Sequence, residues 1–372
     1  MTLVEPLTAR QYQKFLPADV AVQYLDAAGA LTKSEARYPK PSDDSLVEMY
    51  RKMVLGRRFD QQATALTKQG RLAVYPSSRG QEACQIAAAM SLKPTDWMFP
   101  TYRDSVALAA RGVDEVQILS MLAGDWHCGY DPAHHRSAPQ CTPLATQLLH
   151  ATGVAYGESR KGHDAIALAF CGDGATSEGD FHEALNFAAV FKSPVVFLVQ
   201  NNGFAISVPL ARQSVAPSLA HKGVGYGIGS EQVDGNDPIA MLAVMEEAAK
   251  FVRAGNGPVI IEAHTYRIDA HTNADDATRY RDSSEVEQWL GRDPIARLET
   301  YLRDAKRLDD KLVEQVTAEA ETAAAALRAG MNTDRPSDPR DLFRYVFAEP
   351  TPQLREQQAQ IEAELAAESE EN

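Results

Sequence analysis

The first apolar pattern along the chain has helical spacing. Ser42 or Asp43 can cap a helix, and Gly70 is the kind of residue that ends one. A second helix is predicted over residues 81–90, whereas residues 1–40 show no such periodicity and are expected to form a surface arm. The apolar positions of the first helix are Leu46, Met49, Tyr50, Met53 and Val54, which recur every three or four residues.

The middle of the chain alternates short apolar runs with helical stripes. The runs lie at residues 164–170, 195–199 and 258–263, and residues 239–253 and 285–329 are predicted to be helical. Strands that are apolar on both faces and joined by helices are typical of a parallel sheet covered on both sides. We therefore predict an α/β fold of this kind. A further helical stripe between the first two runs consists of Phe181, Leu185, Ala188 and Ala189.

The predicted organisation is an N-terminal arm (1–40), a main domain (41–330) and a C-terminal extension (331–372). Residues 355–372 contain six Glu and one Arg, which predicts a polar helix or a frayed acidic tail. The whole chain of 372 residues carries 37 Lys and Arg against 51 Asp and Glu, a net charge of −14. This charge argues against a general nucleic-acid binder, which needs a basic face.

Other features of composition narrow the class of protein further. No apolar run reaches the roughly 18 residues of a membrane span. The four cysteines form no C-x-x-C pair and are too few for a disulfide framework. We therefore expect a cytoplasmic protein that acts neither on nucleic acid nor in a membrane.

The segment with the clearest chemistry is Gly172-Asp173-Gly174 together with Asn201-Asn202. Each follows a predicted strand, and a helix lies between them. In a right-handed βαβ unit both would therefore lie at the carboxyl edge of one sheet. Carboxylate and amide oxygens suit Mg²⁺, which keeps phosphate oxygens among its other ligands. The glycines let the backbone approach a bulky anion closely. The sequence thus predicts a site for magnesium and a phosphate.

Three other patterns in the chain do not complete a known phosphate-binding or zinc-binding motif. Gly157 and Gly162 have the spacing of a Walker loop, but His163-Asp164 follows where Lys and Ser or Thr are needed. The glycine-rich run at 223–229 does not satisfy G-x-G-x-x-G. His127, Cys128, His134 and His135 lie within nine residues, but their spacing fits no standard zinc pattern.

The segment from Gly172 to Asn202 resembles the thiamine diphosphate signature. The string G-D-G-A-T-S-E-G-D-F-H-E-A-L-N-F-A-A-V-F-K is similar to the α subunits of the heterotetrameric 2-oxo acid dehydrogenases, the first components of the pyruvate and branched-chain complexes. The resemblance covers about residues 45–330. It includes T-Y-R at 101–103, T-P-L-A-T-Q at 142–147, N-N-G-F-A-I-S at 201–207, V-D-G-N-D at 233–237 and T-Y-R-I-D-A-H at 265–271.

This resemblance implies a thiamine-diphosphate-binding fold and assigns roles to particular residues. Asp173, Asn202 and the carbonyl of Phe204 would bind Mg²⁺. His271 would be the catalytic residue, assisting proton transfer during acyl transfer, work that suits an ordinary histidine pKa near 6.5. The residues implied to bind thiamine diphosphate are Tyr102, Arg103, Leu144, Gly172, Gly174, Ala175, Asn202 and His271.

Three positions carry a different residue from the one that some relatives have. The resemblance places a potassium site in some members at Cys141, Pro143, Thr146 and Gln147, but Cys141 stands where branched-chain relatives have a hydroxyl residue. Gln200 stands where some relatives have an Arg facing the phosphate. Thr272 falls where animal relatives carry a regulated serine.

The resemblance also implies an activity and its partners. The reaction would be the oxidative decarboxylation of a branched-chain 2-oxo acid, 3-methyl-2-oxobutanoate and its homologues, with transfer of the acyl group to the lipoyl group of an acyltransferase component. A β subunit would complete each site in an α₂β₂ heterotetramer and would supply the glutamate that activates the cofactor. Pyruvate is the alternative substrate. More distant alternatives are a single-subunit thiamine decarboxylase or transketolase and a non-catalytic scaffold.

Overall fold

The centre of the molecule is a parallel sheet with strand order β1-β2-β3-β7-β6. This computed structural model describes residues 16–32, 37–125, 127–333 and 338–371, with side chains up to residue 368. The strands of the sheet are β1 (Trp97–Phe99), β2 (Ala167–Gly172), β3 (Val195–Asn201), β6 (Gly229–Asp234) and β7 (Val259–His264). A separate antiparallel pair joins β4 (Phe204–Ala205) to β5 (Val208–Pro209).

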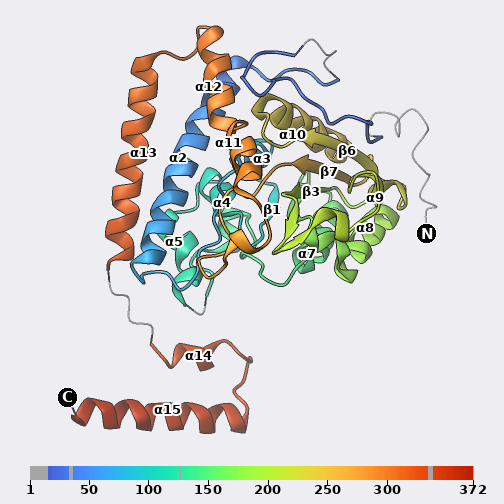
Figure 1. Ribbon diagram of the computed structural model, residues 1–372. Coiled ribbons are helices and arrows are strands. Elements are labelled where there is room, and N and C mark those ends of the chain that lie inside the picture. Colours follow the sequence, from blue (N-terminus) through green and yellow to red (C-terminus); the bar gives the residue numbers. More distant parts are fainter. Residues whose placement is uncertain (1–15, 33–36, 126, 334–337, 372) are drawn as a thin grey trace.

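Helices surround the sheet and connect its strands (Figure 1). The longer ones are α2 (Asp43–Lys68), α3 (Glu82–Met90), α7 (Thr146–Arg160), α8 (Gly179–Phe191), α10 (Pro238–Arg253), α11 (Ser283–Leu290), α12 (Pro294–Asp304), α13 (Asp310–Met331) and α15 (Pro352–Glu371). The short α-helices are α4 (Ser105–Ala110), α5 (Glu115–Leu119), α6 (Pro132–His135), α9 (His221–Val224) and α14 (Asp341–Arg344). Four 3₁₀ turns are η1 (Met121–Ala123), η2 (Gly174–Ser177), η3 (Leu210–Arg212) and η4 (Ala277–Arg279).

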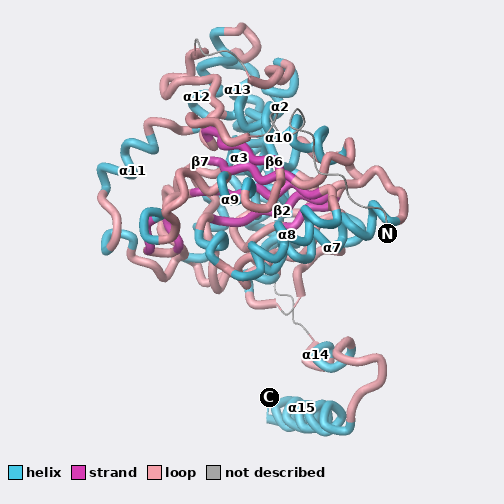
Figure 2. The backbone as a smooth tube through the Cα atoms, turned by 90° about the vertical axis from the view of Figure 1, so that its right-hand side faces the viewer, coloured by secondary structure: helices cyan, strands magenta, loops and turns pink. Residues whose placement is uncertain are grey.

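The alternating side chains of the central strands pack into two different cores. On β3, Val195, Phe197 and Val199 face the core formed with α7 and α8. Val196 and Leu198 face the opposite core, which includes α3 and α10. Figure 2 shows the strands lying between these two helical layers. Burial of both faces explains why the strands read as continuous apolar runs, and it confirms the predicted α/β class.

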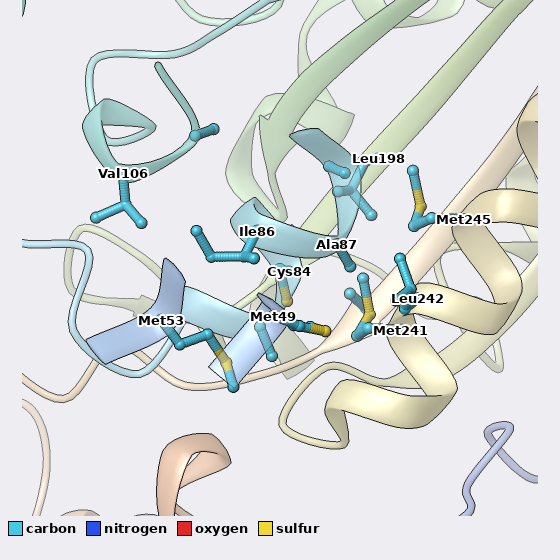
Figure 3. Packing of buried hydrophobic residues seen from close by; sticks show 14 of the residues in the cluster. Met49, Met53, Cys84, Ile86, Ala87, Val106, Leu198, Met241, Leu242 and Met245 are labelled. Atoms are coloured by element: carbon cyan, nitrogen blue, oxygen red, sulfur yellow. The ribbon is translucent and has the colours of Figure 1, made fainter. Parts of the chain in front are cut away.

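The core on the α3 and α10 side is rich in methionine and small residues. Met49 and Met53 from α2 belong to the same core as Ala87 from α3 and Met241 from α10, and Figure 3 shows Met49 between Met53 and Met241. Ala87 is fully buried, and its small side chain lets the helices around it approach closely. Flexible methionine side chains fill the irregular gaps that remain. This core supports the strand ends from one side of the sheet.

The prediction that residues 285–329 form one continuous helix is wrong, because three helices occupy this stretch. The carboxylate of Asp293 accepts hydrogen bonds from the backbone N–H groups of Ile295 (2.9 Å) and Ala296 (3.1 Å) and so begins α12. Asp309 begins α13 in the same way through Leu312 N–H (2.8 Å). Local caps at Asp293 and Asp309 therefore start new helices where composition alone favoured one.

The edge strand β6 was absent from the sequence prediction because its residues are largely polar. Glu231 is fully buried, and it accepts a hydrogen bond from Tyr38 Oη (2.6 Å). The described part of the N-terminal arm runs parallel to this strand, with Val22 N–H bonded to Gln232 O (2.9 Å). The arm thus covers the sheet edge, which would otherwise expose unpaired backbone groups. The expected arm over residues 1–40 is described only at 16–32 and 37–40; residues 1–15 and 33–36 lie outside the described part.

Candidate active site

Two strand ends bring the predicted signature together. β2 and β3 are parallel, and Gly172 pairs with Gln200 in their register, so Asp173 and Asn202 emerge at the same sheet edge. Both residues line a cavity of about 210 Å³. Every site residue predicted from the sequence lines this cavity: Tyr102, Arg103, Leu144, Gly172, Asp173, Gly174, Ala175, Asn202, Phe204 and His271.

Asp173 presents a carboxylate oxygen that has no partner. The residue is 1% exposed, and its Oδ1 atom is buried without a hydrogen bond, whereas Oδ2 accepts one from Gln213 Nε2 (2.7 Å). Burial raises the pKa of this carboxyl, against the lowering effect of the Gln213 hydrogen bond. A buried carboxylate with a free oxygen at a cavity is suited to bind a cation.

The second strand end contributes Asn202 and the backbone that follows it. Asn201 points elsewhere, because its Nδ2 atom donates to the buried Glu262 Oε1 (2.7 Å). Asn202 is 7% exposed and lines the cavity, and its Oδ1 atom accepts from Phe204 N–H (3.3 Å). The alternation of the strand thus selects Asn202, and not its neighbour, for the cavity.

Two buried arginines lie side by side at the cavity. Arg103 is 5% exposed and donates to Ser77 O (2.9 Å) and His271 O (3.0 Å). Arg267 is 1% exposed and donates to Ile206 O (2.7 Å) and Tyr280 Oη (2.8 Å). Among the described residues, neither guanidinium forms an ion pair with a carboxylate. Two buried cations whose partners are neutral favour an anion, and a planar guanidinium suits a phosphate.

His271 lies between these guanidinium groups. Its Nδ1 atom is 3.2 Å from Arg103 Nη2 and 3.1 Å from Arg267 Nη1. Because arginine can only donate, Nδ1 accepts, and the neutral ring carries its proton on Nε2. Burial, followed by the charges of Arg103 and Arg267, lowers the pKa of His271 to about 4. In the protein without ligands the pKa of His271 therefore lies below the ordinary value near 6.5.

The glycine in the centre of the signature allows a close approach of two segments. A Cβ atom at Gly174 would lie 2.7 Å from Cβ of Ala205, on the β4–β5 hairpin. Any larger residue would push this hairpin, and the cavity wall that it forms, away from the end of β2. Tyr102 lies across the cavity, with its ring 6.1 Å from that of His271, and Leu144 is partly exposed at the rim.

Sequence reasoning missed Arg267 as a site residue, and it left Gln200 without a role. Arg267 lies inside the T-Y-R-I-D-A-H motif. The motif could have singled out this arginine, but the sequence does not show that its side chain reaches the cavity. Gln200 Nε2 donates to Asp104 Oδ1 (2.6 Å), and burial raises the pKa of Asp104. Gln200 therefore ties the end of β3 to the residue that follows Arg103.

The His and Cys cluster of residues 127–135 receives no support as a metal site from the geometry. Within the described residues, no three His, Cys, Asp or Glu side chains are grouped so that they could hold a metal. His127, Cys128, His134 and His135 therefore form no such group. In the segment of the possible potassium site, Thr146 Oγ1 donates to Asp180 Oδ2 (3.0 Å). Gln147 Nε2 donates to Phe170 O (2.7 Å), and its buried Oε1 atom has no hydrogen-bond partner among the described residues. The potassium site therefore stays a prediction.

Residues 50–329 match the family described as the dehydrogenase E1 component. This chain belongs to that family. The chain is 47% identical over 346 residues to the 3-methyl-2-oxobutanoate dehydrogenase subunit alpha of Mycobacterium tuberculosis (strain H37Rv), covering 93% of this chain and 94% of the relative. It is 38% identical over 330 residues to the pyruvate dehydrogenase E1 component subunit alpha of Acholeplasma laidlawii, covering 87% and 94%. Membership confirms the resemblance that the sequence showed.

The chain has no helix in its described part that could span a bilayer, since none there is both long enough and apolar enough. Its four cysteines are free thiols. Gly172, Asp173, Gly174 and Asn202 of the predicted signature line the cavity at the carboxyl edge of the sheet. The donor set there fits a magnesium diphosphate group, because it combines a free carboxylate oxygen and an amide with two guanidinium groups that form no ion pair among the described residues.

Proposed function

We propose that this chain is the α subunit of a thiamine-diphosphate-dependent branched-chain 2-oxo acid dehydrogenase. It would decarboxylate 3-methyl-2-oxobutanoate and its homologues oxidatively, in branched-chain amino acid catabolism, and pass the acyl group to the lipoyl group of an acyltransferase component. The observation that carries this proposal is that one cavity combines the free Asp173 Oδ1 atom with Arg103 and Arg267, which form no ion pair with a carboxylate among the described residues. A diphosphate that carries Mg²⁺ satisfies both halves of this cavity at once.

Each group of the cavity has a defined task in this proposal. Asp173, the side chain of Asn202 and the carbonyl of Phe204 would hold Mg²⁺, because hard oxygen ligands suit this ion. Arg103 and Arg267 would hold the diphosphate, while Gly174 keeps the wall close enough for contact. When bound, thiamine diphosphate supplies the nucleophilic carbon and the electron sink that decarboxylation needs.

His271 would act as a neutral hydrogen-bond donor beside the reacting atoms. Its Nδ1 atom is engaged by the two arginines, so the ring orientation is fixed and Nε2 is left to hold a proton. A bound diphosphate would add negative charge beside the same arginines and so raise the pKa of His271 from about 4 toward neutrality. The ring could then exchange a proton during acyl transfer at physiological pH.

A β subunit would complete the site in an α₂β₂ assembly, and two exposed apolar surfaces support this. Tyr156 on α7 packs on Phe191 of α8, with ring centroids 5.1 Å apart, and Phe187 stacks on Phe191, yet these rings are partly exposed. A second surface follows α14, where Tyr345 is 76% exposed. Exposed apolar patches of this kind mark protein interfaces. The relatives, too, are named as alpha subunits.

We also propose a cytoplasmic location, which the free thiols support because reduced cysteines persist in that compartment. Neither nucleic acid nor a membrane is expected as a partner.

Substrate choice is tested with the chain co-expressed with its β subunit. CO₂ release is measured from labelled 3-methyl-2-oxobutanoate and from labelled pyruvate, with a lipoyl domain as acceptor. We expect kcat/KM for the branched-chain acid to exceed that for pyruvate at least about tenfold, since one pocket can discriminate by 1–3 kcal/mol per methylene. A preference for pyruvate would establish the alternative that the chain is a pyruvate dehydrogenase α subunit. The 38% identity to such a subunit is the basis of this alternative. Release from neither acid would contradict the proposal.

A further inference from the structure

We infer that Gln213 is a positioning residue that aims the carboxylate of Asp173 at the metal. Its Nε2 atom donates to Asp173 Oδ2 (2.7 Å), and the other oxygen, Oδ1, stays buried without a partner. A carboxylate can rotate about its last bond, so either oxygen could otherwise face the cavity. The hydrogen bond at Oδ2 selects one orientation and leaves Oδ1 free to bind a cation.

The amide of Gln213 can take only one orientation here. Nε2 lies 2.7 Å from Asp173 Oδ2 and 2.9 Å from Val208 O, and both atoms are acceptors. A flipped amide would place its oxygen against both of them, which is repulsive. The two protons of the NH₂ group are thus both used, and Oε1 is left buried and unpaired. A buried amide oxygen that goes unpaired has a free-energy cost, which is accepted here to keep the donor on Asp173.

Gln213 also connects the two strand ends that supply the proposed ligands. Val208 belongs to β5, which pairs with β4, the strand that contains Phe204. Leu210 N–H donates to Gly203 O (2.9 Å), and Gln213 N–H donates to Leu210 O (2.8 Å). Through these contacts one side chain fixes the hairpin after Asn202 to the carboxylate after β2. Hydrogen bonds to a ligating carboxylate typically change metal affinity 10- to 100-fold.

This inference rests on the proposed metal site, and the experiment separates the two. The full-length chain is purified with its partner subunit and saturated with thiamine diphosphate, and Mn²⁺ replaces Mg²⁺ as a paramagnetic probe. Binding of Mn²⁺ is titrated by electron paramagnetic resonance in wild type, Gln213→Met and Asp173→Ala. The matched control is Val215→Ala, because Val215 is fully exposed on the same segment. Methionine keeps the length of the side chain but donates no hydrogen bond. The thermal unfolding midpoint of each variant is measured as a check on folding.

We expect Gln213→Met to weaken Mn²⁺ binding about tenfold or more and to broaden the Mn²⁺ spectrum relative to wild type, with Val215→Ala unchanged. Unchanged affinity in Gln213→Met, together with lost binding in Asp173→Ala, would overturn the role of Gln213 alone. Tighter binding in Gln213→Met would also overturn it, because the amide would then compete with the metal. Unchanged binding in Asp173→Ala would instead refute the proposed metal site itself.

Discussion

Two side chains of the cavity have pKa values shifted against their charged forms. Asp173 is buried, with one oxygen unpaired, and its pKa is raised by that burial. His271 stands beside two guanidinium groups, and its pKa is lowered to about 4. In each case the ligand-free protein bears a cost that a bound ligand of opposite charge would remove. This arrangement is expected of a binding site, where stability is given up for function.

Replacing Asp173 with alanine should separate binding from folding. We expect Asp173→Ala to lose Mg²⁺-dependent binding of thiamine diphosphate, while the ligand-free variant is at least as stable as wild type. The reason is that the substitution removes a buried, half-paired carboxylate together with its desolvation cost. Thermal unfolding with and without Mg²⁺ and the cofactor measures both effects. A variant that the cofactor still stabilises as it does wild type would contradict the metal role.

A second prediction concerns the contribution of His271 to the dependence of stability on pH. Between about pH 6.5 and the folded pKa of about 4, the unfolded chain binds a proton on His271 that the folded chain does not. Stability should therefore fall as the pH drops through this window, and His271→Ala should remove this part of the fall. Urea unfolding at pH 7 and pH 5 measures the difference. An identical pH dependence in wild type and variant would show that the imidazole titrates normally.

Replacing the same histidine with alanine should also affect acyl transfer more than decarboxylation. We expect His271→Ala to bind thiamine diphosphate within a few-fold of wild type, because Arg103 and Arg267 remain. Acyl transfer to a lipoyl domain should fall about 10²-fold or more, as is typical when a proton-transfer group is removed. Decarboxylation measured with an artificial electron acceptor should fall much less. Wild-type rates in both assays would remove His271 from the mechanism.

At the scale of elements, short local signals decide where helices start and how loops approach the sheet. Aspartate caps divide residues 285–329 into α11, α12 and α13, and Ser42 begins α2 by accepting from Ser45 N–H (3.1 Å). The loop before α3 lies against the segment that follows β7. Gly80 makes this contact possible, with a φ of +94° and a carbonyl that accepts from Thr265 Oγ1 (2.7 Å). Arg267 follows only two residues after Thr265.

Gly80→Ala is therefore expected to destabilise both the fold and the site. A Cβ atom would lie 2.3 Å from Tyr266 O, and the left-handed backbone would be strained as well. We expect a loss of roughly 2–4 kcal/mol in the free energy of unfolding, and weaker cofactor binding. Gly112→Ala is the matched control, because Gly112 has a φ of +85° but no neighbour within 4 Å, so it should lose only about 1 kcal/mol. Equal losses in urea denaturation would show that the close approach has no cost.

At the scale of the whole molecule, the described C-terminal part stands apart from the body that holds the site. Figures 1 and 2 show α14 and α15 lying away from the rest of the chain. The exposed apolar side chains after α14 include Tyr345, Val346 and Phe347. At least half of each of these side chains is exposed. We assign them to the proposed β subunit.

Deleting residues 338–372 should therefore affect assembly but not folding of the body. We expect the thermal midpoint of the isolated chain to change by no more than about 2 °C, because no buried core is lost. Co-purification with the β subunit and tetramer formation, measured by light scattering, should be lost. The double variant Tyr345→Ser and Phe347→Ser is the finer test, and should weaken assembly without shortening the chain. Normal tetramers in both variants would place the interface elsewhere.

The sequence by itself determined the α/β class, the position of the signature at a sheet edge and the family. Each of these depends on local information: two-sided apolar runs predict buried parallel strands, and Asp173 and Asn202 directly follow two of them. The long apolar stripe of α2 and its Ser42 cap were equally visible. All ten predicted site residues line one cavity, because parallel strands in register end at a common edge.

Only the tertiary structure decided the features that depend on contacts between distant segments. Strand β6 is polar in sequence and becomes a strand because β7 pairs with it and Tyr38 satisfies Glu231. Arg267 enters the site because the chain after β7 turns back beside Arg103. The pKa of His271 is lowered by its burial and then by the charges of Arg103 and Arg267, and the carboxylate of Asp173 is oriented by Gln213, 40 residues away in sequence. Charge and hydrogen bonding act through space, so these properties arise only once the chain has folded.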